Sequence, residues 1–343
     1  MSALSLEHWA RALLEGAGLE GRAAGTVAVS LVEASVRGVD SHGVARLPIY
    51  VQRLRAGGLN RAPRPRVVRE HAAVALVDGD HGPGQVAGVF AAELSAELAG
   101  GHGVGAVSVR NSSHYGAAAH YVMPLARRGL IALSTSNADP LVIPFGGRER
   151  ELGTNPIALA APAGDELFVL DMATSQVAAN RVWGARDEDR PIPEGWAVDE
   201  HGAPTTDPAA AHAMMPLGGY KGYGLAAMVE ILSGVLAGAG VGFGVAPLFD
   251  ADERAQEVGH FHLTLDPELT VGRTGFEQRL HGMLERLRQS PPAEGFREVL
   301  VAGDPEERAR REREAAGVPV ARPLWEQLEQ LSAEFGVTPP ADV

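Results

Sequence analysis

From residue 73 onward the chain alternates short β-rich runs with longer helical segments, and this alternation restricts the fold to an α/β layer. Helical periodicity predicts connecting helices at 85–98 and 117–128. Apolar, β-branched runs predict strands at 73–77, 104–109, 130–135, 157–161, 167–170 and 260–265. The sequence therefore predicts a mixed sheet covered by helices.

Both ends of the chain have helical patterns. Leu6, Trp9 and Leu13 keep a helical period near the N-terminus. Helices are expected at 6–14, 20–36, 275–289, 305–316 and 324–335. We expect the two ends to pack together, so that residues 1–72 with 274–343 form a helical domain beside an α/β region of residues 73–273.

The composition fits a globular protein of roughly two domains, with 343 residues, 45% hydrophobic and 21% charged. A net charge of -13 argues against nucleic acid or an anionic membrane as the main partner. The chain has no cysteine, which excludes disulfides and thiolate chemistry. The longest apolar stretch, near 225–242, contains Glu230 and Ser233, so we expect a buried helix and a cytoplasmic protein.

Lys221 is the only lysine, although lysine and arginine together number 30. It lies in a glycine-rich stretch, 218–224, that leads into an apolar helix at 225–236. Glycines let a ligand approach the backbone, and a helix N-terminus favours an anion. Lys221 is therefore a candidate phosphate contact; the alternative is a surface lysine in an arginine-rich chain.

Several standard nucleotide and hydrolase motifs are missing from the sequence. No Gly-x-Gly-x-x-Gly follows a predicted strand, and the glycines of 101–105 precede one, as in a helix-to-strand turn. The chain also lacks a phosphate-binding Walker loop, Gly-x-Ser-x-Gly and His-Glu-x-x-His. A bound nucleotide would have to be held in another way.

A first polar cluster follows the second predicted helix and comprises Ser41, His42, Arg46 and Tyr50. Arg46 and Tyr50 are four residues apart at a helix start, so their side chains share one face, and Pro48 fits the first turn. The guanidinium fork of arginine matches a carboxylate. The alternative is a capped helix start with Arg46 in a surface ion pair.

A second polar cluster, 111–116, follows the strand expected at 104–109 and includes His114. Ligands in α/β folds gather at the carboxyl ends of strands. An imidazole at this place can accept a proton from a hydroxyl group. A lone histidine can also be a structural hydrogen-bonding group, but the flanking Asn, Ser and Gly residues favour a functional role.

A third group of turns, 137–140, 153–156 and 171–175, also follows or precedes strands and can expose amides to an anion. The same residues are ordinary turn formers. The 12 histidines could instead bind zinc, but no carboxylate is spaced for a known triad. We therefore expect no metal site.

Five motifs carry a resemblance that covers nearly the whole chain. They are Asp40-Ser41-His42-Gly43-Val44-Ala45-Arg46, Asn111-Ser112-Ser113-His114-Tyr115-Gly116, Gly153-Thr154-Asn155-Pro156, Asp171-Met172-Ala173-Thr174-Ser175 and Gly219-Tyr220-Lys221-Gly222-Tyr223-Gly224-Leu225. The chain resembles the malate/L-lactate dehydrogenase family that is unrelated to the Rossmann-fold enzymes. That family also includes ureidoglycolate and sulfolactate dehydrogenases and piperideine-2-carboxylate reductase.

The resemblance implies a non-Rossmann nucleotide-binding fold and an oxidoreductase that uses NAD or NADP, with sites near the interface of a homodimer. It implies hydride transfer between the nicotinamide and a small 2-hydroxy acid of the malate or lactate type. His114 would accept the proton, with Ser41, His42, Arg46 and Tyr50 beside the substrate. The implied cofactor contacts are Asp139, Thr154, Met172, Ala173, Thr174, Lys221 and Gly303.

The chain departs from the family pattern at two places: Ala302 replaces a proline, and Asn180-Arg181 replaces Gly-Lys. The second change leaves the choice between NAD and NADP open. Residues 58–61, 137–140 and 197–199 look closer to ureidoglycolate dehydrogenases. Reduction of a cyclic imino acid is a further alternative, and a metal-dependent lyase or a non-catalytic binding protein is the alternative from another class.

Overall fold

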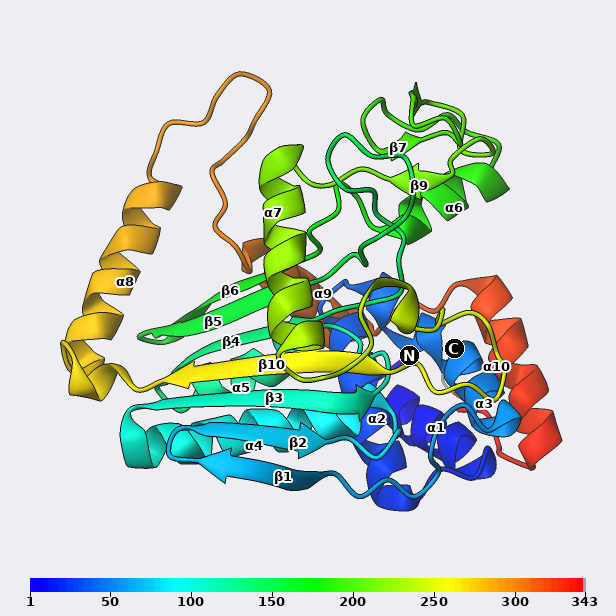
Figure 1. Ribbon diagram of the computed structural model, residues 1–343, viewed down its shortest axis with the longest axis horizontal. Coiled ribbons are helices and arrows are strands. Elements are labelled where there is room, and N and C mark those ends of the chain that lie inside the picture. Colours follow the sequence, from blue (N-terminus) through cyan, green and yellow to red (C-terminus); the bar gives the residue numbers. More distant parts are fainter. Residues whose placement is uncertain (342–343) are drawn as a thin grey trace.

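The computed structural model describes residues 1–341 and has a seven-stranded mixed sheet at its centre (Figure 1). The strand order is β1-β2-β3-β10-β4-β5-β6. The strands are β1 Arg66–His71, β2 Val74–Asp78, β3 Val104–Ser112, β4 Ile131–Ser136, β5 Ile157–Ala163, β6 Glu166–Met172 and β10 Val258–Leu265. The predicted α/β class with a mixed sheet is confirmed.

Strand direction explains why the polar clusters can meet. β2 is parallel to β3, whereas β10 is antiparallel to both β3 and β4, and β5 is antiparallel to both β4 and β6. β2, β3, β4 and β6 therefore run in one direction, and their carboxyl ends lie at the same end of the sheet. β10 and β5 start at that end, so the residues before them also lie there. The turns that precede or follow these six strands therefore lie together.

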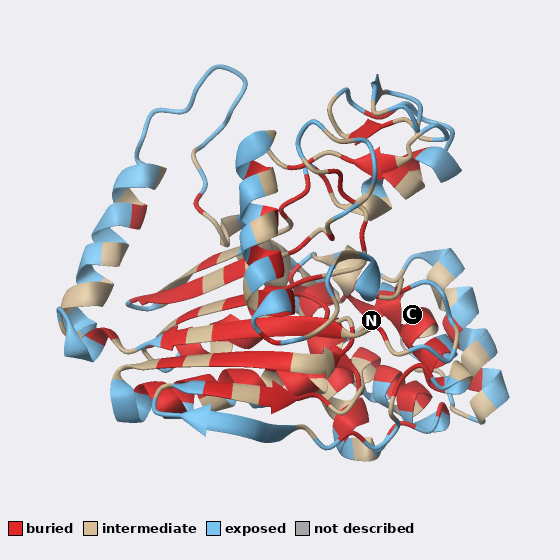
Figure 2. Cartoon of the chain, in the orientation of Figure 1, coloured by how far each residue is buried: buried red, intermediate tan, exposed pale blue. Residues whose placement is uncertain are grey.

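Helices cover the sheet and form a second layer at its end (Figures 1 and 2). α4 packs on β3 and β10, and α5 packs on β4 and β5. The apolar residues between α4 and the sheet, among them Ala91 and Val107, are fully buried. The helices are α1 Ala3–Gly16, α2 Gly21–Val36, α3 Leu47–Ala56, α4 Gly84–His102, α5 Ala119–Ala126, α6 Ala179–Asp187, α7 Tyr220–Val229, α8 Arg273–Arg288, α9 Asp304–Ala316 and α10 Arg322–Phe335.

The two ends of the chain contact each other. α1 packs on α10 and α2 packs on α9. The Trp9 indole donates a hydrogen bond of 2.7 Å to the Ser332 hydroxyl, and both side chains are buried. α8 instead packs on β5, where Leu284 is fully buried beside Ala163. The predicted division into two domains, residues 1–72 with 274–343 and residues 73–273, stays a proposal. Residues 342–343 lie outside the described residues.

Several elements were not expected from the sequence. β1 forms the exposed edge of the main sheet. The polar, proline-rich segment after α6 contains a small sheet of β7 Ala197–Val198, β8 Pro204–Thr205 and β9 Ala213–Met214. Two-residue strands leave almost no periodic signal in a sequence.

The apolar segment after Lys221 was predicted to be a buried helix; the helix is confirmed, but the prediction that it is buried is wrong for one of its faces. α7 continues as a π-helix, Glu230–Val235, that packs on β10 and β4 on one side only. On the other side, Ile231 and Val235 are 57% and 58% exposed. A helix that is apolar on nearly all faces can be covered by another subunit as well as by its own core. Among residues 1–341, no helix is long and apolar enough to cross a membrane.

Arg53 on α3 anchors the loop that precedes β10. Its side chain is fully buried, and its guanidinium donates hydrogen bonds to the carbonyl oxygens of Asp250 at 2.6 Å and Arg254 at 2.7 Å, with longer contacts to Pro247 and Leu248. Four main-chain acceptors on one side chain fix the path of residues 247–254. This loop carries Phe249 into the site described next.

Candidate active site

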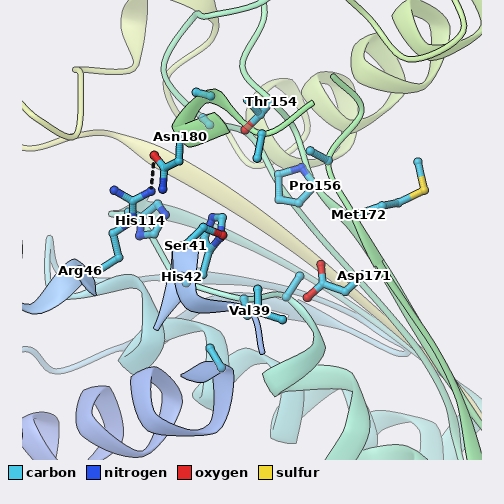
Figure 3. A pocket seen from close by; sticks show the side chains of 18 of the residues that line it. Val39, Ser41, His42, Arg46, His114, Thr154, Pro156, Asp171, Met172 and Asn180 are labelled. Atoms are coloured by element: carbon cyan, nitrogen blue, oxygen red, sulfur yellow. Dashed lines mark hydrogen bonds between the residues drawn. The ribbon is translucent and has the colours of Figure 1, made fainter. Parts of the chain in front are cut away.

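The turns at this end of the sheet surround a cavity of about 290 Å³ (Figure 3). Strand direction brings residues from β3, β4 and β6 together with the segment between α2 and α3. Eight of the residues predicted from the sequence line this cavity: Ser41, His42, Arg46, His114, Asp139, Thr154, Met172 and Ala173. Residues far apart in the sequence thus meet at one place.

His114 is held at both its main chain and its ring. Its amide donates to the Gln256 side-chain oxygen at 3.1 Å, and its Nδ1 lies 2.6 Å from the Tyr50 hydroxyl. Gln85 donates to the same hydroxyl at 2.8 Å. Because Nδ1 is occupied by Tyr50, Nε2 is the ring nitrogen that remains for proton exchange with a ligand. Gly116 supports the turn with a φ of +77°, a conformation that favours glycine.

Burial keeps both histidines neutral. The rings of His42 and His114 stack with centroids 5.6 Å apart. Burial lowers the pKa of His42 to about 4, and Arg46 adds to this effect. Burial also lowers the pKa of His114 well below 6.5, with smaller effects of His42 and Arg46. A neutral imidazole is the form that accepts a proton.

Arg46 is a buried cation with an unused donor. Its side chain is 9% exposed, and its guanidinium lies 5.1 Å from the centre of the Phe249 ring. One terminal nitrogen donates to the Asn180 side-chain oxygen at 3.2 Å, whereas the buried Nε has no partner. A buried guanidinium with only one side-chain hydrogen bond, on a residue that lines a cavity, has donors left for an anionic ligand.

A buried carboxylate holds two of the turns that line the cavity. Glu230 on the π-helix accepts hydrogen bonds from the side-chain amides of Asn137 at 3.1 Å and Asn155 at 2.8 Å. Asn137 lies two residues before Asp139, and Asn155 directly follows Thr154. Burial raises the pKa of Asp139. Glu230 therefore fixes the position of both predicted contacts.

The far end of the cavity is lined by carboxyl groups and small side chains. In Figure 3, Arg46 and His114 lie at one end and Asp171 and Met172 at the other. The Asp171 carboxylate accepts a hydrogen bond of 2.8 Å from the Ala119 amide. Several alanines are among the residues that line the cavity. Carboxylates that accept from ribose hydroxyls and a wall of small residues fit a nucleotide.

Four predicted residues do not line the cavity. Tyr50 lies directly behind His114, and Thr174 is buried, donating to the Thr154 carbonyl at 3.1 Å. Gly303 lines a separate cavity of about 790 Å³ and packs against the main chain of Val169. Lys221 is exposed on the first turn of α7, outside the cavity of its own chain.

The sequence analysis did not identify five residues at or behind the site: Gln85, Arg53, Phe249, Gln256 and Glu230. Glu230 accepts the hydrogen bonds that hold the two turns. Only Glu230 had a signal, because an acid within an apolar helix must find buried donors. The others act through contacts between distant segments. Within residues 1–341, no three histidine or carboxylate side chains converge as metal ligands would.

Replacing Tyr50 by phenylalanine tests the support of His114. The change removes the partner of Nδ1 and leaves the buried Gln85 amide unpaired, so the free energy of unfolding should fall by about 1–3 kcal/mol. Turnover should fall by roughly tenfold or more, as expected when a partner that orients a proton-transfer group is lost. Chemical denaturation and steady-state kinetics measure the two effects. Unchanged turnover would show that the ring is oriented without Tyr50.

The fold thus brings a neutral histidine and a buried arginine to one cavity. A family model described as malate/L-lactate dehydrogenase matches residues 1–329. The chain is 39% identical to a ureidoglycolate dehydrogenase (NAD(+)) from Escherichia coli O157:H7, over 91% of this chain and 90% of that protein. It is 40% identical to a malate dehydrogenase from Pyrococcus horikoshii, over 91% and 88% of the two chains.

A solved structure of the sulfolactate dehydrogenase from Methanocaldococcus jannaschii superimposes with a TM-score of 0.93 at 37% identity, covering 98% of both chains. The chain therefore belongs to the malate/L-lactate dehydrogenase family. It is an oxidoreductase of the class that acts on the CH–OH group of hydroxy acids.

Proposed function

We propose that this cavity binds a small 2-hydroxy acid beside a nicotinamide dinucleotide and catalyses reversible oxidation to the 2-oxo acid. Arg46 holds the substrate carboxylate, and His114 accepts the proton of the hydroxyl group. The observation that carries the proposal is that a buried guanidinium, whose one hydrogen bond is to Asn180, lines the same cavity as a neutral imidazole. Positioning of this kind supplies up to roughly 7–11 kcal/mol of the barrier reduction.

The proposed cofactor is NAD or NADP, which supplies the hydride acceptor when bound. Asp139, Thr154, Met172 and Ala173 line the cavity where it would lie, and Thr174 supports the Thr154 turn. The relatives include enzymes named for NAD(+) and for NADP(+), so both cofactors belong in the test. Gly303 remains a proposed contact through the neighbouring cavity.

A homodimer is part of the proposal, as is the cytoplasmic location expected from the sequence. The exposed apolar face of α7 and the π-helix, which includes Met228, Ile231 and Val235, is the surface we assign to the contact between subunits. Lys221 is exposed at the start of the same helix and outside its own cavity. If Lys221 contacts a cofactor, that cofactor is therefore the one bound to the partner subunit.

Placing charges on this face should break the dimer. In an Ile231→Asp/Val235→Asp variant, two carboxylates would be buried without partners, so association should weaken by at least roughly 10²-fold. Analytical ultracentrifugation measures the change. Leu269→Asp, at a 69% exposed apolar residue outside this face, is the matched control and should leave the dimer intact. Dimers that persist in the double variant would place the contact elsewhere.

The pH dependence should report the neutral His114 imidazole. Because its pKa is lowered, His114 is already deprotonated at pH 6.5. The rate of hydroxy acid oxidation should therefore fall only below that pH, where His114 becomes protonated and can no longer accept a proton. Reduction of the oxo acid needs the protonated ring, so it should slow as pH rises above the lowered pKa. Rates of both directions from pH 4.5 to 9, with His114→Ala as the reference, test this; an inflection from His114 above pH 7 would contradict it.

The activity itself is tested by measuring cofactor reduction with a panel of 2-hydroxy acids and both cofactors, and the reverse reaction with 2-oxo acids. We expect at least one acid to support turnover that depends on cofactor and protein concentration. Fluorescence titration with NADH and NADPH accompanies the assay. Binding of neither cofactor, together with no turnover, would favour a lyase or a non-catalytic binding protein.

A further inference from the structure

The charges around the substrate end of the cavity restrict which 2-hydroxy acids it can hold. Of the arginines that line the described cavity, Arg46 belongs to this end and Arg37 to the other. The electrostatic neighbours of Arg37 are Glu33, Asp171 and Glu306, whereas that of Arg46 among the acids is Asp139. The substrate end thus has one fixed positive charge and one carboxyl group.

The remaining walls at this end provide no second cation. Desolvation lowers the pKa of both His42 and His114, so both half-buried rings are neutral. Leu248, Phe249 and Trp183 add apolar surface, and the Trp183 and Phe249 rings meet edge to face with centroids 5.3 Å apart. Once a substrate carboxylate takes Arg46, a second anionic group would face apolar rings or Asp139. A buried charge without a partner is strongly disfavoured.

Asn180, on the first turn of α6, offers a neutral contact at the same place. Its side-chain oxygen accepts from Arg46 at 3.2 Å, which leaves the amide nitrogen as a free donor. In Figure 3 this carboxamide lies beside the Arg46 guanidinium and on the same side of the cavity as His114. A substrate whose carboxylate binds Arg46 would lie beside Asn180, and we place the group on its third carbon next to this amide.

From these contacts we infer that the preferred substrate is a 2-hydroxy acid with a single negative charge and that Asn180 selects for a neutral hydrogen-bond acceptor on its third carbon or the equivalent atom. This inference rests on the proposed function and names its substrate class. An amide donor suits a hydroxyl, carbonyl or ureido group. One neutral donor does not offset the desolvation of a second carboxylate or a sulfonate beside Asp139.

The test compares kcat/KM for lactate, glycerate and ureidoglycolate with kcat/KM for malate and sulfolactate, using the full-length protein and whichever cofactor is active. At least one singly charged acid should exceed both doubly charged acids by roughly tenfold or more. Asn180→Ala should lower kcat/KM for glycerate and ureidoglycolate by about tenfold relative to lactate, whose methyl group makes no hydrogen bond. Asn180→Arg should raise the malate-to-lactate ratio by a similar factor, because it adds the missing cation.

The outcomes separate this inference from the proposed function. A preference of the unmodified protein for malate or sulfolactate would overturn the inference and leave a 2-hydroxy acid dehydrogenase. An equal loss for every acid in Asn180→Ala would show that Asn180 only supports Arg46, which also overturns the selective role. Absence of turnover with all acids and both cofactors would remove the proposed function and the inference together.

Discussion

Replacing His114 by alanine should abolish most of the turnover while the protein still binds its cofactor. The ring lines the cavity with Nδ1 next to the Tyr50 hydroxyl, and desolvation keeps it neutral, so the variant loses the group that we propose as acceptor of the hydroxyl proton. A general base typically contributes about 10²–10⁴-fold to the rate, and we expect kcat to fall within that range. Steady-state kinetics with the best substrate measure the loss.

The His114 variant needs a control for the loss of an imidazole as such. His102→Ala is suitable, because His102 is exposed at the end of α4, far along the sheet from the cavity edge. It should retain full activity. Fluorescence titration should give similar dissociation constants for NADH or NADPH in all three proteins. Full turnover in His114→Ala would show that another group accepts the proton.

Replacing Arg46 by methionine should remove substrate binding and leave cofactor binding in place. The guanidinium lines the cavity, and it is the group to which we assign the substrate carboxylate. Loss of charged hydrogen bonds to a buried carboxylate costs about 2–5 kcal/mol, which corresponds to roughly 30-fold to several thousand-fold in kcat/KM. Lysine at this position should recover only part, because an ammonium cannot form the two parallel bonds of the fork.

The effect of Arg46→Met should appear in binding more than in chemistry. Titration with oxamate, a singly charged analogue of a 2-oxo acid, in the presence of cofactor measures this directly. Phe249→Leu is the matched comparison, because it removes the ring that faces the guanidinium but keeps the charge. It should weaken oxamate binding far less. Equal binding of oxamate to Arg46→Met and the unmodified protein would exclude Arg46 as the carboxylate contact.

Much of the site could be predicted because its residues interrupt regular patterns. His114 and Asp139 follow strands directly, and strands β3 and β4 end at one edge, so their neighbours had to meet there. Arg46 and Tyr50 share a helix face by simple spacing. The α/β class followed from alternation alone, since each predicted strand of the main sheet is bounded by turn residues.

What the sequence could not predict depends on contacts between distant segments. Nothing local indicates that β10 inserts between β3 and β4, yet this insertion brings Gln256 to the His114 amide. The loop that carries Phe249 takes its position from Arg53, nearly 200 residues earlier in the chain. Asn180 was visible as a departure from the family pattern, but only the fold shows that its carboxamide meets Arg46.

Lys221 illustrates a different limit. Its uniqueness in the composition suggested a phosphate contact, but composition does not determine where a helix points. α7 packs through its C-terminal continuation on β10, and its first turn extends away from the sheet (Figure 1). The apolar pattern after Lys221 likewise indicated burial, but one face of the helix is exposed in this chain.

The most direct test of the whole account is a crystal structure of the protein with a nicotinamide dinucleotide and oxamate bound. In that structure the carboxylate of oxamate should bind the Arg46 guanidinium, and its C2 oxygen should lie within hydrogen-bonding distance of the His114 ring. The nicotinamide should lie beside it in the same cavity. Oxamate bound away from Arg46, or a His114 ring out of reach of the C2 oxygen, would contradict it.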